Sequence, residues 1–118
     1  MTTYPNWFEC YADRYFKAHL TPLAGLPGLR FLQIGAFTGD ASLWLLTNIL
    51  TGPGSTLVDV DTWEGSDEAV HDSFDFADVE RVYDARTAKH QKSGQLVKIK
   101  MTSADYFATE SSDEFDFI

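Results

Sequence analysis

The stretch from Arg30 to Asp61 constrains the fold more than any other part of the sequence. It contains two short apolar runs, over residues 30–34 and 56–61, and a segment with helical spacing between them, over residues 40–50. Glycines and a proline separate the three pieces, and such residues interrupt regular structure. A strand–helix–strand unit of this length predicts two parallel strands of one sheet with a helix packed on it.

The remainder of the chain continues this alternation. The apolar spacing predicts helices over residues 4–19 and 73–91, a strand over 96–100, a short helix over 104–108 and the start of a fourth strand over 114–118. We therefore expect an α/β fold, a Rossmann-like parallel sheet with flanking helices that is truncated after the start of the fourth strand. Residues 1–29 would form an N-terminal helix and turn, and residues 30–118 the first half of the domain.

Each predicted helix carries an apolar face. The first has an aromatic stripe made of Trp7, Phe8, Tyr11, Tyr15 and Phe16. This stripe would either pack on the sheet or a partner, or cover a neighbouring active site as a lid. The inward residues expected in the later helices are Leu43, Leu46 and Leu50, then Phe76, Val79, Val82 and Tyr83.

The net charge indicates which classes of partner the protein can bind. The chain has 9 Lys and Arg against 18 Asp and Glu, a formal net charge of −9. Such a chain repels a phosphate backbone and an anionic membrane surface, so we expect no nucleic-acid and no membrane partner. No apolar run is long enough to span a bilayer. The single cysteine, Cys10, permits no internal disulfide and no thiolate zinc site, which fits a cytoplasmic protein.

A glycine-bounded loop, G-A-F-T-G over residues 35–39, joins the first strand to its helix. Glycine lets a ligand approach the backbone closely, and the following helix start presents free N–H groups. The dinucleotide fingerprint is G-x-G-x-x-G. The G-x-x-x-G spacing suits the methionine half of S-adenosylmethionine (SAM) better than a pyrophosphate. Many strand-to-helix turns without a ligand also carry two glycines.

Two further positions lie at predicted strand ends. Asp61 ends the second strand, where an acidic residue commonly accepts hydrogen bonds from ribose hydroxyls. Asp59 points the same way but lies farther from the strand end, and the alternative for Asp61 is the capping of a turn. Ser103 follows the third strand, where it would contact the adenosine, cap the short helix, or do both. The ring of Trp63 would pack against the adenine of a ligand or lie in the core.

Three segments together resemble a known family. Residues 32–46 (LQIGAFTGDASLWLL) resemble the first SAM-binding motif of class I SAM-dependent methyltransferases of the methyltransferase domain family 24 type, typically E-I-G-x-F-x-G-x-S followed by W-L-L. Residues 60–66 (VDTWEGS) are similar to its I-D-T-[FW]-x-G stretch. Residues 113–118 resemble the start of its fourth strand, which continues there into I-D-G-x-H.

The resemblance implies SAM as cofactor and a small hydroxylated molecule, such as a sugar, as methyl acceptor. The expected cofactor-binding residues are Gln33, Gly35, Ala36, Phe37, Thr38, Gly39, Asp61, Thr62, Trp63 and Ser103. Gln33 replaces the family's usual acid, which contacts the cofactor amino group, so it offers an acceptor without charge. The I-D-G-x-H segment, source of a metal-binding Asp and a basic His in related enzymes, has no counterpart. We therefore assign no catalytic residue and no metal.

Three functions remain open from the sequence. The chain is the cofactor-binding half of a methyltransferase, an inactive SAM- or nucleoside-binding module, or an interaction protein. The fourth strand would leave Phe115, Phe117 and Ile118 on an apolar edge. We therefore expect a homo-oligomer or a second chain, or a continuation of this one, to cover that edge. His71 among Asp67, Glu68, Asp72 and Asp75 matches no metal-ligand spacing and is interpreted as an acidic surface.

Overall fold

Three parallel strands form the centre of the computed structural model, which describes residues 4–64, 74–109 and 114–118. The strands are β1 (Arg30–Ile34), β2 (Thr56–Asp61) and β3 (Leu96–Lys100), in the order β1-β2-β3. Their bounds match the three apolar runs of the sequence. The register places Gln33 beside Asp59 and Asp59 beside Lys98. The chain therefore has an α/β fold with a parallel sheet.

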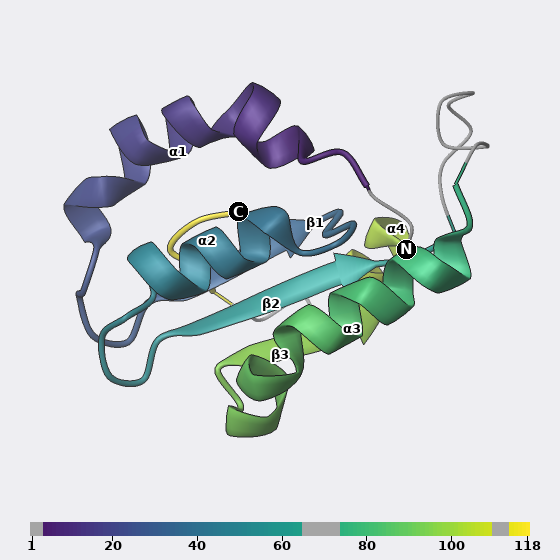
Figure 1. The fold of residues 1–118 in the computed structure, drawn as a ribbon. Helices are drawn as coiled ribbons and strands as arrows, with labels where there is room; N and C mark the ends of the chain where they lie inside the picture. Colours follow the sequence, from purple (N-terminus) through teal and green to yellow (C-terminus); the bar gives the residue numbers. More distant parts are fainter. Residues whose placement is uncertain (1–3, 65–73, 110–113) are drawn as a thin grey trace.

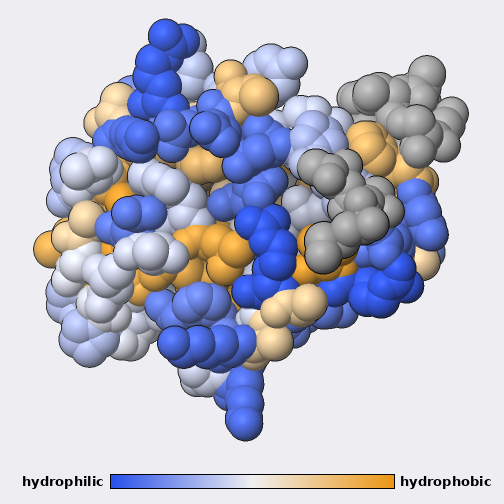
Figure 2. Space-filling model, in the orientation of Figure 1, coloured by the Kyte–Doolittle hydropathy of each residue, from blue (hydrophilic) through white to orange (hydrophobic). Residues whose placement is uncertain are grey.

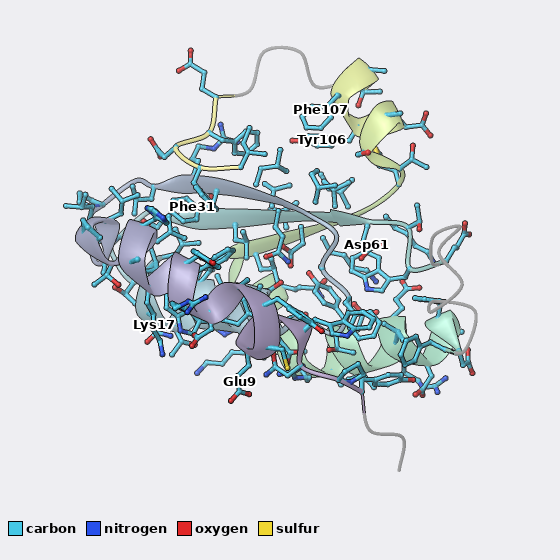
Figure 3. All side chains as sticks on the ribbon, turned by 90° about the horizontal axis from the view of Figure 1, so that it is seen from above. Glu9, Lys17, Phe31, Asp61, Tyr106 and Phe107 are labelled. Carbon is cyan, nitrogen blue, oxygen red and sulfur yellow. The ribbon has the colours of Figure 1, made fainter. Side chains whose placement is uncertain are left out.

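Helices cover both faces of this sheet (Figure 1). One face carries α2 (Asp40–Asn48), α3 (Phe76–Ser93) and the N-terminal helical segment, which consists of η1 (Phe8–Ala12), α1 (Asp13–Leu20) and η2 (Thr21–Leu23). The short helix α4 (Ser103–Thr109) lies on the other face. Figure 3 shows these two layers, with Tyr106 and Phe107 of α4 across the sheet from Lys17 of α1.

Side-chain alternation along the strands produces two apolar clusters, one per face. The larger cluster includes Phe31, Leu45, Leu57 and Tyr83, and the smaller contains Leu32, Val58, Val60 and Tyr106. The surface in Figure 2 is mostly hydrophilic, with apolar residues showing in patches between the polar ones.

The helix ends follow local chemistry. α2 begins after Gly39, whose φ of 87° is left-handed. The carboxylate of Asp75 caps α3 by accepting hydrogen bonds from the N–H groups of Ala77 and Asp78, and Gly94 ends this helix with a φ of 83°. Ser73, the first residue of the predicted helix, lies outside the described residues.

Three predictions about helix faces and ends were inaccurate. The first helix begins near Trp7 rather than at residue 4, and Tyr11 and Tyr15 are 76% and 55% exposed. Only Trp7, Phe8 and Phe16 of the stripe pack inward, because a helical turn brings them to one side. Of the inner residues predicted for the helix after the glycine loop, Leu46 and Leu50 are buried as predicted, but Leu43 is only half-buried. Ser42 and Leu45 complete the buried face of α2.

The predicted fourth strand is reduced to one bridge. Phe117 pairs with Phe31 in parallel, and its carbonyl accepts a 2.9 Å bond from the N–H of Leu32. The carboxylate of Asp116 accepts the N–H of Arg30 at 2.8 Å, a bond that a strand would make with a backbone carbonyl. The N–H of Asp116 still donates to the carbonyl of Arg30 at 2.7 Å, so the pairing with β1 is an isolated bridge rather than a strand.

Among the described residues, no helix has the length and apolar character that crossing a bilayer requires.

Candidate functional site

The carboxyl ends of the three strands meet at one edge of the sheet. β1 ends in the glycine loop, and the N–H of Gly35 donates to the carbonyl of Val60 at 2.8 Å. β2 ends at Asp61, whose carbonyl accepts a 3.1 Å bond from the N–H of Met101 after β3. Figure 3 shows Asp61 at this end of the sheet. Ligands of parallel α/β sheets bind at this edge, so these residues form the candidate site.

The carboxylate of Asp61 organises the loop. Its Oδ2 accepts hydrogen bonds from the backbone N–H of Ala36 at 2.8 Å and of Phe37 at 3.1 Å. Its Oδ1 accepts the N–H of Trp63 at 3.0 Å. The structure therefore brings the first loop and the tip of β2 into direct contact, whereas the sequence led us to expect free amides and a carboxylate that both face a ligand.

Two residues of this assembly have unusual backbone angles. Phe37 and Trp63 have φ values of 49° and 51°, in the left-handed region that non-glycine residues rarely adopt. The indole N–H of Trp63 also donates to the carbonyl of Phe37 at 2.9 Å. Such strain costs on the order of 1–3 kcal/mol per residue and persists where the surroundings hold it. The bonds to Asp61 and between the two residues supply that restraint.

This arrangement decides which ligands the loop can take. The N–H groups of Ala36 and Phe37 already point at a carboxylate, so they are not presented to a phosphate. The negative charge of Asp61 would also repel one. A carboxylate has about four acceptor positions, and three are used here, which leaves capacity for a donor such as a hydroxyl.

A cavity of about 350 Å³ lies beside the loop, between it and the N-terminal helical segment. Its aromatic wall comes from Trp7, Phe8, Tyr11, Phe16 and Phe37. The opposite wall is formed by Gln33, Ile34, Gly35, Ala36, Asp40 and Ala41. Four of the predicted cofactor-binding residues, Gln33, Gly35, Ala36 and Phe37, thus line one cavity. The N-terminal segment lines one side of it and also packs on Trp44 and Phe117.

The two loop glycines serve different purposes, although both have a φ of 87°. A Cβ on Gly39 would lie 3.2 Å from Tyr83 Cδ2 and 3.4 Å from Thr87 Cγ2. A Cβ on Gly35 would meet no atom within 4 Å. Gly39 therefore permits close packing of α3, whereas Gly35 borders open space beside the cavity.

Thr38 is placed away from the cavity. It is buried, its hydroxyl donates to Asp40 at 3.3 Å, and its carbonyl accepts a 2.8 Å bond from Arg86. Arg86 also forms a 2.8 Å ion pair with Asp40. Thr38 therefore fastens the end of the loop to α3.

Two predicted site residues lie past Asp61. Thr62 is half-buried and accepts the N–H of Glu64 at 3.2 Å, which makes a local turn. Trp63 is 2% exposed and packs on Tyr83 at 4.7 Å between ring centroids, so the structure places it in the core.

Ser103 is exposed at the start of α4, at the same edge of the sheet. The hydroxyl of Thr102, and not that of Ser103, caps this helix by accepting the N–H of Asp105 at 3.0 Å. The capping role predicted for Ser103 therefore belongs to the preceding residue.

A buried polar group was missed by the sequence interpretation. Asp59 is fully buried and accepts hydrogen bonds from the hydroxyls of Ser42 and Tyr83. The only available signal was a second Asp in the apolar run T-L-V-D-V-D, two residues before Asp61. Its partners come from other elements, so local sequence could not identify them.

Within residues 4–64, 74–109 and 114–118, no group of three or more His, Cys, Asp or Glu side chains is placed so that it could hold a metal ion. The acidic loop around His71, with Asp67, Glu68 and Asp72, lies outside the described residues.

Comparisons with protein-family models, with curated proteins and with solved structures found no match.

Proposed function

We propose that this chain binds S-adenosylmethionine at the carboxyl edge of its sheet, as the cofactor-binding part of a methyltransferase acting on a small hydroxylated acceptor. The observation that carries the proposal is the contact between Asp61 and the glycine loop, beside the cavity lined by Gln33, Gly35, Ala36 and Phe37. One ribose hydroxyl would donate to the remaining acceptor position of Asp61, and the methionine half would occupy the cavity.

The loop N–H groups that are already bonded to Asp61 favour SAM over a dinucleotide as the ligand. SAM carries an adenosyl group without a phosphate, and its positive sulfonium suits an edge where Asp61 supplies negative charge. A dinucleotide would need the N–H groups of Ala36 and Phe37, which Asp61 occupies. The volume of about 350 Å³ also lies within the range usual for small-molecule sites.

The strand order is compatible with a Rossmann-like sheet. Phe117 bridges to β1 on the side opposite β2, so the spatial order is Phe117, β1, β2, β3. In doubly wound folds the first strand lies centrally and the chain reverses direction beside it, which creates the crevice for a ligand. The loop after β1 lies at that position.

The proposed reaction is a direct displacement. The acceptor oxygen attacks the methyl carbon, the carbon–sulfur bond breaks, and S-adenosylhomocysteine (SAH) leaves while the acceptor loses its proton to a base. Most of the acceleration in such a reaction comes from alignment of the two reactants. The chain's contribution is to hold the adenosyl and methionine ends at fixed points.

Isothermal titration calorimetry with SAM, SAH and NAD⁺ tests the proposal. We expect SAM and SAH to bind and NAD⁺ to give no heat. Asp61→Ala should weaken SAH binding by about tenfold to a hundredfold, because hydrogen bonds to a charged group are lost. Asp105→Ala removes the same charge from an exposed position on α4 and should leave the affinity unchanged. Thermal melting of both variants checks that they remain folded.

Two results would contradict the proposal. One is the absence of any SAH binding by the folded wild-type chain, and the other is equal affinity in the Asp61 and Asp105 variants. Turnover is a separate question: incubation with SAM and a set of sugars and phenols should release SAH from an enzyme and none from a binding module.

A further inference from the structure

Two buried side-chain oxygens in the sheet have no hydrogen-bond partner among the described residues, Asp59 Oδ1 and Gln33 Oε1. They belong to residues that pair directly across β1 and β2. Both side chains also meet Ser42 of α2, whose hydroxyl donates to Asp59 Oδ2 at 2.5 Å and accepts from the Gln33 amide nitrogen at 3.3 Å. The two unpaired oxygens therefore belong to neighbouring groups on one face of the sheet.

Asp59 in its ionised form would be a buried charge without a counter-ion. The side chain is fully buried, and its hydrogen bonds within the described chain come from two uncharged hydroxyls. Its neighbour on β1, Gln33, does not titrate. The charged groups on the other adjoining elements are already bonded to one another: Lys98 of β3 to Glu80 and Asp84 of α3, and Arg86 of α3 to Asp40 of α2. Such surroundings favour the neutral acid over the carboxylate.

The hydrogen bond of the Gln33 amide also indicates a neutral Asp59. An ionised carboxylate only accepts, so its free oxygen would draw a donor, and Gln33 carries one in its NH₂ group. That NH₂ group is bonded to Ser42 instead, which leaves one acceptor on Gln33 and one on Asp59 without a donor. A proton on Asp59 Oδ1 supplies both needs, because the acid hydroxyl donates and Gln33 Oε1 accepts. Oδ2 still accepts from Ser42 and Tyr83.

We propose that Asp59 carries a proton on Oδ1 and shares it with Gln33 Oε1, so that a neutral acid–amide pair joins β1 to β2 inside the fold and makes its stability sensitive to pH. Gln33 lies two residues before Gly35, and Asp59 two residues before Asp61, so the pair adjoins the candidate site. Loss of the proton adds a second negative charge to the face of β2 that already carries Asp61. This pair forms without a ligand and does not depend on the proposed function.

Burial decides the pH range in which Asp59 holds its proton. It raises the pKa of the carboxyl from 3.8 to about 6, while the hydroxyls of Ser42 and Tyr83 lower that pKa and nearby Asp61 raises it. Between about pH 4 and about pH 6 the folded state therefore binds more protons than the unfolded state. The stability that this group contributes should fall as the pH rises through that range and level off above it.

Urea unfolding of Asp59→Asn tests the pair without any ligand. The Asn side chain imitates the protonated acid, because its NH₂ group can donate to Gln33 Oε1 and its oxygen can accept from Ser42. The folded-to-unfolded ratio of the wild type, divided by that of Asp59→Asn, should fall about tenfold from about pH 5 to about pH 8, as a folded pKa of about 6 requires. Asp105→Asn, at an exposed position of α4, is the control and should give a constant quotient. A quotient for Asp59→Asn that is constant or rises with pH overturns the inference.

Carbon-13 NMR of the Asp59 carboxyl tests whether Gln33 shares the proton. The wild-type midpoint should lie near pH 6, and a midpoint below about pH 4.5 would refute the neutral acid. Gln33→Met keeps the length of the side chain but removes the acceptor, so the midpoint should move down by about 0.5–1 in pH, the scale of one hydrogen bond.

Tyr83→Phe is the matched variant with the opposite sign. It removes a donor to the carboxylate, and that bond lowers the pKa of Asp59, so the midpoint should move up. Thermal melting checks that both variants remain folded. A midpoint that Gln33→Met leaves unchanged or raises would show that burial alone holds the proton, and the shared pair would be refuted.

These measurements contain neither SAM nor SAH, so they are decided separately from cofactor binding. A folded chain that binds no SAH and still shows both midpoint shifts would lack the proposed function and keep the acid–amide pair. Binding of SAH by a chain that shows neither shift would leave the proposed function standing and remove the pair.

Discussion

At the scale of single residues, the two glycines of the loop have different roles, which the sequence alone does not distinguish. Gly35 and Gly39 have the same left-handed φ, but one borders open space and the other touches α3. Phe37 between them accepts a strained φ because Asp61 and Trp63 hold its backbone. One glycine thus serves the site and the other serves the fold.

This difference gives a prediction from a matched pair of substitutions. Gly39→Ala should lower the free energy of unfolding by about 2–4 kcal/mol, because backbone strain adds to overlap with Tyr83. Gly35→Ala should cost only the strain, about 1 kcal/mol. Urea denaturation measures both values. For SAH affinity the order should be reversed, with Gly35→Ala weaker by about tenfold or more. Equal losses of stability in the two variants would show that close packing at Gly39 does not add to the cost of the substitution.

At the scale of elements, a cluster of charges fixes α3 on the edge strand β3. Lys98 contacts Glu80 at 2.6 Å and Asp84 at 2.9 Å, and its ammonium lies 4.9 Å from the centroid of the Trp63 ring. Its side chain is only 16% exposed, whereas that of Lys100, which also pairs with Glu80, is 51% exposed. The pKa of Glu80 is lowered by Lys100 and Lys98, which favours its ionised form.

The two lysines allow a controlled test of this docking. Lys98→Met should reduce the free energy of unfolding by about 1–3 kcal/mol, since it leaves Glu80 and Asp84 partly unpaired near the core. Lys100→Met should cost less than about 1 kcal/mol, as is usual for an exposed pair. Thermal or urea unfolding distinguishes them. Similar losses for both lysines would mean that burial of Lys98 adds nothing to the docking.

At the scale of the whole molecule, the two ends of the chain are joined through aromatic rings. Phe117 lies 5.9 Å from Phe16 of α1 and 5.3 Å from Phe31 of β1, measured between ring centroids. Phe16 also packs on Phe8 and Trp44. The segment that covers the cavity is therefore held in part by the last residues of the chain.

Removal of the Phe117 ring should loosen that cover. Phe117→Ala is expected to cost about 2–4 kcal/mol of stability and to increase hydrogen exchange in the backbone of α1, because Phe16 loses one side of its packing. Ile118→Ala, at a position 65% exposed, is the control and should change neither quantity measurably. Unchanged exchange in α1 after Phe117→Ala would show that the N-terminal segment is held without the C-terminal end.

The three strands and their parallel pairing could be read from the sequence, as could the position of the glycine loop and Asp61 at one edge of the sheet. Those features depend on local apolar runs, on glycine punctuation, and on the rule that parallel strands end at one edge. The tertiary structure alone decided what the polar atoms do there. It turned the amides of Ala36 and Phe37 toward Asp61, buried Asp59 with Ser42 and Tyr83, and paired the carboxylate of Asp116 with the N–H of Arg30. Each of these depends on a partner from another element, because a hydrogen bond is directional and its partner is found only once the elements have packed.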